Sequence, residues 1–173
     1  MGQRLTDKTA LTQQVGSGDL LMVVDVNDTT GSAEGTSKKM DFKYLLQTDK
    51  ISLSNAEVQA LNTTSKTLVG ALSGYMITPI TCTMIVTYAS ATESSNNSLL
   101  IGYDDSTTSY AWWSGGRFFN GSTTDRTYAM VSTNSITDTA SIINKPFIMW
   151  SGGAFNGGWT ADIYVTYCYT KVL

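Results

Sequence analysis

Along most of the C-terminal part of the chain, apolar and polar residues alternate with a period of two. Residues 80–88 place Ile80, Cys82, Met84, Val86 and Tyr88 on one side of an extended chain, and Thr81, Thr83, Ile85 and Thr87 on the other side. Residues 161–170 repeat this pattern. Each segment therefore predicts a β-strand with one buried face and one face coated with threonine.

Further short apolar runs follow the same rule and are separated by residues that favour turns. Pro79 and Pro146 are expected at strand starts, where a missing backbone N–H matters least. Eight strands in 107 residues predict an all-β domain, an antiparallel β-sandwich of the jelly-roll type. The additional candidate strands are residues 67–72, 98–103, 109–114, 127–132, 141–145 and 147–151.

One short helix is predicted before these strands. Ser54 and Glu57 have the spacing of a capping box, in which each side chain bonds the backbone N–H of the other residue. Leu53 and Val58 occupy the two positions of a hydrophobic staple around this cap. We expect a helix over residues 55–61, and Glu57 is explained better as a cap than as a catalytic acid.

The N-terminal part of the chain predicts a hairpin. Leu20–Val26 is an apolar run of strand length, residues 37–42 form a second candidate strand, and residues 27–36 between them are rich in turn formers. An isolated hairpin is marginally stable in water, so it must pack on the following domain, on its own copies or on another protein. We expect an attachment segment, and the candidate contact residues are Leu20, Leu21, Met22, Val23, Val24 and Val26.

Charge density divides the chain in the same way. Residues 1–66 carry seven basic and eight acidic residues, whereas residues 67–173 carry four basic and six acidic residues. A β surface with so few charges is poorly protected against association, and it is often covered by copies of itself. These observations predict an attachment segment over residues 1–50 and a self-associating sandwich over residues 51–173.

The composition excludes several kinds of chemistry. The chain has no histidine, so Ser-His-Asp and Cys-His machinery is absent, and its two cysteines cannot form a four-thiolate zinc site. The spacing around Asp25 differs from that of a calcium loop. Basic residues are few and scattered, which argues against nucleic acid as a partner. No signal peptide or membrane span is predicted, so we expect cytoplasmic synthesis, no membrane contact and no cofactor or metal.

Aromatic residues gather at or beside two glycine-rich turns, and they leave two interpretations open. Residues 113–121 (WSGGRFFNG) and 150–158 (WSGGAFNGG) resemble each other and are interpreted as two similar turns. Their rings fill the core or a subunit interface, or alternatively stack on the sugars of a host surface. The residues concerned are Trp112, Trp113, Trp150, Trp159, Phe118, Phe119 and Phe155.

A third class, a glycoside hydrolase, would need two carboxylates on either side of a scissile bond. Five acidic residues fall in polar loop segments, but no spacing selects a pair, and such residues are mostly solvated. We therefore expect a protein that is not an enzyme. The carboxylates considered are Glu93, Asp104, Asp105, Asp125 and Asp138.

Residues 51–72 (ISLSNAEVQALNTTSKTLVGAL) resemble the opening of a recurrent domain in virion proteins of tailed bacteriophages. There, a strand, a capped short helix, an Asn-Thr-Thr step and a Leu-Val strand introduce a jelly roll. Residues 16–46 are similar to a module near the N-termini of phage fibre and decoration proteins, where it joins a distal domain to the particle. This chain departs from the usual pattern at Ser65, where a proline is common, and over residues 72–76.

The resemblance implies a homotrimeric structural component of a virion, displayed on the capsid or in a head or tail fibre. Its implied partners are further copies of itself and a capsid or tail protein. Host-glycan recognition at a fibre tip is the alternative function. These expectations come from the resemblance, whereas composition alone indicates an uncharged β domain that self-associates.

Overall fold

The computed structural model describes residues 20–31, 33, 35–41, 45–103, 110–133 and 142–172. The chain divides into two compact units, Met1–Leu45 and Leu46–Leu173. The second unit begins ahead of residue 51, because residues 47–50 belong to the first strand of the sandwich.

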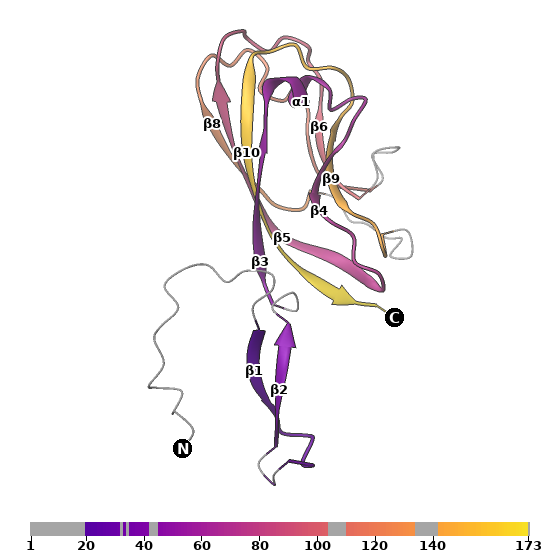
Figure 1. Ribbon diagram of the computed structural model, residues 1–173. Helices are drawn as coiled ribbons and strands as arrows, with labels where there is room; N and C mark the ends of the chain where they lie inside the picture. Colours follow the sequence, from indigo (N-terminus) through magenta and orange to yellow (C-terminus); the bar gives the residue numbers. More distant parts are fainter. Residues whose placement is uncertain are drawn as a thin grey trace. The chain divides into compact units, whose positions relative to one another are not determined.

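The described part of the second unit is a β-sandwich of eight strands with one short helix (Figure 1). All strand pairs are antiparallel. The strands are β3 (Gln47–Leu53), β4 (Lys66–Val69), β5 (Tyr75–Tyr88), β6 (Leu99–Gly102), β7 (Ala111–Gly115), β8 (Arg126–Met130), β9 (Phe147–Ser151) and β10 (Trp159–Lys171).

The order of the strands confirms the predicted jelly roll. One sheet has the order β3-β10-β5-β8 and the other has the order β4-β9-β6-β7. The pairings nest inside one another, because β3 pairs with β10, β4 with β9, β5 with β8 and β6 with β7. A long antiparallel hairpin rolled up on itself gives this arrangement, with two sheets that pack face to face.

The core lies between the two sheets, and the alternation in the sequence accounts for it. Cys82, Met84 and Val86 of β5 are fully buried, whereas Thr81 and Thr87 on the other face are exposed. In β10, residues 161, 163, 165 and 167 are buried and the residues between them are only partly so. The predicted faces are therefore confirmed at these positions. The prediction is wrong at Ile80, which is 46% exposed because it lies at the register shift between β5 and β10.

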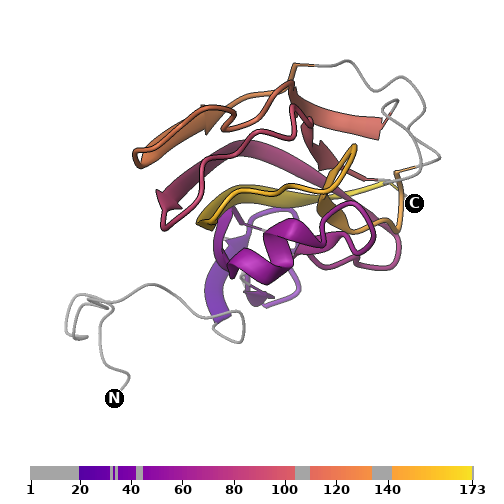
Figure 2. The same cartoon turned by 90° about the horizontal axis from the view of Figure 1, so that it is seen from above.

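Helix α1 (Asn55–Gln59) connects the two sheets and carries the predicted cap (Figure 2). The Ser54 N–H donates to Glu57 Oε2 at 2.9 Å, and the Glu57 N–H donates to Ser54 Oγ at 3.4 Å. The helix ends at Gln59, earlier than expected, because the backbone continues into turns in which Thr63 and Thr64 both donate to the Ala60 carbonyl.

Two strand expectations are corrected. Residues 142–145 form a turn, so the expected strand over 141–145 is wrong in its described part, and β3 completes the set of eight instead. Pro79 lies inside β5 rather than at its start. It sits opposite Tyr167 where the register with β10 shifts, and a bulge tolerates its missing N–H.

The first unit contains the predicted hairpin. Strands β1 (Leu20–Asp25) and β2 (Thr36–Asp41) pair in an antiparallel register that places Val24 opposite Ser37 and Asp25 opposite Thr36. Gly35 follows the loop with φ = 117°, and a Cβ there would lie 2.8 Å from the Asp25 carbonyl oxygen. Only glycine suits this close and left-handed position.

Both cysteines are free thiols, Cys82 in the core and Cys168 partly exposed. Burial raises the pKa of Cys82 to about 12, so this residue acts as a small apolar side chain. Within the described ranges, no helix is long and apolar enough to cross a membrane.

Candidate functional site: the attachment hairpin and the loop end of the sandwich

The hairpin β1–β2 exposes an apolar row, which we call the hairpin row: Met22, Val24 and Val26. Alternation places Met22 and Val24 on one face of β1, and Val26 follows directly in the turn; the three side chains are 71%, 57% and 69% exposed, respectively. Leu21 on the opposite face is 39% exposed. No described residue of this unit is seen to cover the row, which is unusual for three large apolar side chains so close together.

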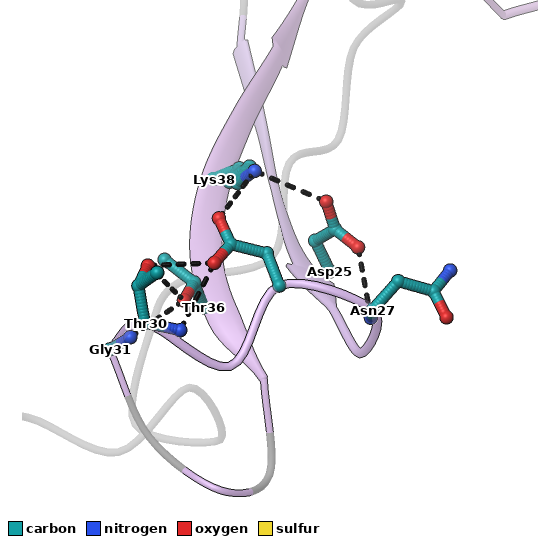
Figure 3. A network of polar contacts seen from close by, with 7 residues as sticks. Asp25, Asn27, Thr30, Gly31, Thr36 and Lys38 are labelled. Atoms are coloured by element: carbon teal, nitrogen blue, oxygen red, sulfur yellow. Dashed lines mark hydrogen bonds and ion pairs between the residues drawn. The ribbon is translucent and has the colours of Figure 1, made fainter.

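The opposite face of the hairpin carries a polar network that fixes the turn (Figure 3). Lys38 Nζ lies 2.7 Å from Asp28 Oδ2 and 3.2 Å from Asp25 Oδ2. The Asp25 and Asp28 carboxylates also accept the backbone N–H groups two residues further on, those of Asn27 and Thr30. These are Asx turns, and they direct the chain back into β2.

The ion pairs change the pKa values of all three charged groups. The hydrogen bond from Lys38, followed by those from Thr30, lowers the pKa of Asp28 to about 2. Lys38 also lowers the pKa of Asp25, and the two carboxylates raise the pKa of Lys38. Both carboxylates thus form ion pairs with Lys38 of the same hairpin. In the described part of the chain, no group of three or more acidic, cysteine or histidine side chains is placed to hold a metal ion.

The aromatic residues singled out from the sequence lie mainly inside the sandwich. Trp159 is fully buried and packs against Phe118, Phe119 and Phe155, with ring centroids 5.2–5.6 Å apart. Trp112 is 6% exposed and meets Phe147 edge to face. This burial favours the packing interpretation, because a buried ring offers no free face to a sugar.

The two tryptophans at β7 face the same core because of a bulge. The register between β6 and β7 shifts after Ile101, so that Gly102 pairs with Ala111 and Ile101 pairs with Trp113. Trp112 is the additional residue, and both indoles contact the main core. Trp113 is the one ring of the set that stays partly exposed, and a Cβ at Gly115 would overlap it.

The two WSGG segments are not equivalent in the structure. Both flank β6, where Leu99 pairs with Gly115 on one side and with Ser151 on the other. The sequence repeat would match Ser151 with Ser114, so the pairing in the sheet is displaced from the repeat by one residue. A displacement of one residue moves side chains to the opposite face of a sheet. Trp150 accordingly belongs to a separate cluster with Leu100, Ala111 and Ile148.

The loops at one end of the sandwich are joined by Glu93, whose role was missed in the sequence. This residue is 1% exposed and accepts the N–H of Ser95 (2.8 Å), Asn156 (3.1 Å) and Gly157 (2.8 Å) and the Trp159 indole N–H (3.2 Å). It therefore ties loop 89–98 to loop 152–158. The isolated position of this carboxylate in an uncharged stretch was the only signal that set it apart.

Backbone bonds bring the third loop, 116–125, into the same assembly. Gly121 donates to the Glu93 carbonyl at 2.8 Å, and Phe118 donates to the Asn97 carbonyl at 2.9 Å. Asn55 of α1 donates to the Gly157 carbonyl, also at 2.8 Å. We call this region the loop end, residues 89–98, 116–125 and 152–158. Its cross-links are typical of a rigid surface.

The charge of Glu93 is stabilised by its hydrogen bonds. Burial alone raises its pKa, but the donors from Ser95, Gly157 and Trp159 outweigh burial and hold the pKa below its ordinary value. The general acid of a glycoside hydrolase needs a raised pKa and a second carboxylate on the other side of the scissile bond. Glu93 therefore has the properties of a structural anchor.

Neither the family models nor the curated proteins include a match to this chain. Among solved structures, it is similar to a chain of the acid-stable capsid of Helicobacter pylori bacteriophage KHP30, at 12% identity and a TM-score of 0.45, covering 89% of this chain and 95% of that chain.

Two further similarities are to a chain of the cyanophage Pam1 capsid and to the PRD1 vertex protein P5. The first has 11% identity and a TM-score of 0.42 and covers 96% of each chain. The second has 15% identity and a TM-score of 0.38, covering 95% of this chain and 93% of that chain. Because all three TM-scores are low, the fold rests on the strand order described above.

Proposed function

We propose that this chain is a non-enzymatic structural protein of a bacteriophage particle. Two features support the proposal: the resemblance of residues 16–46 and 51–72 to virion modules, and a jelly roll with few surface charges, an architecture common in viral capsids. A fold by itself does not define a function. The proposal therefore depends on a surface that fits attachment.

That surface is the hairpin, and the exposed hairpin row is the observation that carries the proposal. Met22, Val24 and Val26 contribute apolar area that a partner would remove from water, at roughly 25 cal/mol per Å². The other face of the hairpin is already satisfied by its own ion pairs. Attachment through β1 thus leaves the polar network intact.

The two strands of the hairpin also differ in how readily a further strand could pair with them. Strand β2 carries Lys38 and Lys39, and lysines on an edge strand discourage further pairing. Strand β1 is apolar from Leu20 to Val24 and ends at Asp25. We infer that β1 adds to an edge of a sheet in a capsid or tail protein, with Leu20, Leu21, Met22, Val23, Val24 and Val26 at the contact.

The domain arrangement follows from this inference. The N-terminal segment, expected over residues 1–50, attaches the protein, and the sandwich is displayed outside the contact. Self-association of the sandwich into a homotrimer is proposed on the resemblance, and the low number of charges in residues 67–173 is compatible with it. Head fibre, tail fibre and capsid decoration are the three places that this proposal covers.

The test uses particles of the phage that encodes the chain. Val24→Asp places a charge in the hairpin row and is expected to remove the protein from purified particles, as detected by immunoblotting. Thr29→Asp is the matched control, because it adds the same charge in the exposed turn without removing an apolar contact. A wild-type protein that is absent from purified particles would refute the virion role, and equal incorporation of the two variants would refute attachment through the row.

Recognition of a host glycan is the second candidate, and one residue supports it. Trp113 is partly exposed, whereas Trp112, Trp150, Trp159 and Phe155 are buried. A glycan array with wild-type protein and Trp113→Ala is the direct measurement. Binding that is lost in this variant, while the unfolding midpoint is retained, would favour a receptor-binding tip.

A further inference from the structure

The sandwich has four strand edges, and they differ in how well they are protected. Strands β3 and β8 border one sheet, and β4 and β7 border the other. An edge strand presents unpaired backbone groups to any other strand. Proteins block such edges with charged side chains, proline, bulges, short strands or a covering segment.

Three of the four edges are blocked. Strand β3 has Asp49 and Lys50 exposed at adjacent positions, and Lys50 is paired with Asp162 at 2.9 Å. Strand β4 is only four residues long and has a register shift after Thr67. Strand β7 contains the bulge described above, and the Thr133 N–H donates to the Trp112 carbonyl at 2.9 Å.

Strand β8 has fewer of these devices: it is short, but it has no bulge, and no described segment is seen to cover it. It pairs with β5 in an unbroken register from Arg126 to Met130, with neither lysine nor proline in the strand. Among the described residues, β5 is its only strand partner, and Figure 1 shows it on the outside of its sheet. Its one charge, Arg126, stands at the first position.

The side chains next to this edge are uncharged. Tyr128 and Met130 face the core, so Thr127 and Ala129 face outward. Val131, directly after the strand, is 65% exposed and extends this outward row. On the neighbouring strand β5, Ile85 is 40% exposed and pairs with Thr127. A second copy of this surface meets no like charge along the outward row.

We propose that β8 pairs antiparallel with β8 of a second copy, about a two-fold axis at Ala129. Ala129 is the middle residue of the outward row, so this register matches Thr127 of one copy with Val131 of the other. The two Arg126 side chains then lie at opposite ends of the contact. Such a contact is self-complementary, as a two-fold interface requires.

This contact rests on the sandwich alone and not on the proposed virion role. It joins two chains or, if the sandwich also trimerises, two trimers. The surface that it buries is small compared with that of a permanent dimer, so its affinity depends on a high local concentration of copies. The experiment must therefore detect two chains that associate only weakly.

A cysteine at the axis provides that measurement. Residues directly opposite each other in antiparallel strands have Cα atoms about 4.5–5.5 Å apart, within the range of a disulfide. Ala129→Cys in a Cys168→Ser background is expected to cross-link a majority of chains into dimers under mild oxidation, on a non-reducing gel. Thr81→Cys is the matched control, since it is exposed on the adjacent strand of the same sheet but away from the edge.

Two outcomes would overturn the proposal: no dimer from Ala129→Cys, or equal dimer from Thr81→Cys. Ala129→Lys gives an independent test, because it places two like charges at the axis while the side chain remains exposed in the single chain. Native mass at high concentration should show an even number of chains for the wild type and half that mass for Ala129→Lys. Equal masses for the two proteins, both folded by circular dichroism, would also overturn it.

Discussion

The sandwich and the hairpin treat apolar side chains in opposite ways. Val165 of β10 is fully buried between the sheets, whereas Val24 of β1 is 57% exposed. Both are valines in regular, antiparallel strands, so local structure does not account for the difference. A second layer encloses the strand in the sandwich, while the described residues of the hairpin unit form only two strands. The proposal that a partner covers the hairpin row rests on this contrast.

The carboxylates of the two regions show the same contrast. Glu93 is enclosed by N–H donors from its own loops and the Trp159 indole, whereas Asp28 balances Lys38 on the surface. Removing one partner from a buried set leaves polar groups without a bond, which is costly. An exposed ion pair can exchange its partner for water, so its loss matters little to stability.

The largest expected effect is at the centre of the loop end. Trp159→Ala removes a fully buried indole that contacts three other rings, and truncations of this kind cost about 3–5 kcal/mol. Chemical denaturation followed by circular dichroism measures the loss. A cost below about 1 kcal/mol would mean that the aromatic cluster tolerates a cavity and does not organise the core.

Glu93→Gln is expected to rank second. The amide retains the shape of the side chain but brings an NH₂ group towards donors, so several N–H groups lose their acceptor, at about 1.5–3 kcal/mol. Equilibrium unfolding at neutral pH gives the value. Glu57→Gln is the comparison in an exposed position, and equal costs for both variants would contradict a special role for Glu93.

The difference in stability between the wild type and Glu93→Gln should depend on pH. The pKa of Glu93 is lowered in the folded chain, so its stabilisation is present above the unfolded value of 4.5 and is lost as the pH falls through the folded pKa. The stability difference between wild type and Glu93→Gln should therefore be largest at neutral pH and shrink in acid. A difference that is constant from pH 7 to about pH 3 would contradict an ionised Glu93.

The smallest effect is expected for a valine-to-alanine substitution in the hairpin, and the same substitution in the sandwich provides the comparison. Val165→Ala is expected to cost about 1.5–3 kcal/mol, because the side chain is fully buried. Val24→Ala should change the stability of the free protein by less than about 0.5 kcal/mol. Thermal unfolding of both variants provides the measurement. A large cost at Val24 would show that the chain itself covers the hairpin row.

Much of the sandwich could be predicted from the sequence, because its information is local. The alternation in β5 and β10 defines which face is buried, and the capping box at Ser54 marks the start of α1. The hairpin was predictable for the same reason. Two apolar or mixed strands separated by turn formers leave few alternatives.

The features that escaped prediction depend on partners far away in the sequence. Glu93 is a structural anchor only because residues 156–159 place three N–H donors around it, whereas its own neighbours in the sequence indicate a solvated loop. The bulge at Trp112 and the proline inside β5 depend on the register of the opposite strand. The sequence repeat at Trp113 and Trp150 misled for this reason, since one residue of register reverses the face.

The position of β10 has a consequence for how the protein is made. It follows the other described strands in the sequence, yet it lies between β3 and β5, and it pairs with β5 along its whole length. The first sheet cannot close before β10 has been made, so β3 and β5 each keep an unpaired edge until then. Contacts between distant parts of a chain also form slowly. The newly made polypeptide thus passes through an interval in which it is prone to aggregate, and that interval lasts until β10 has paired.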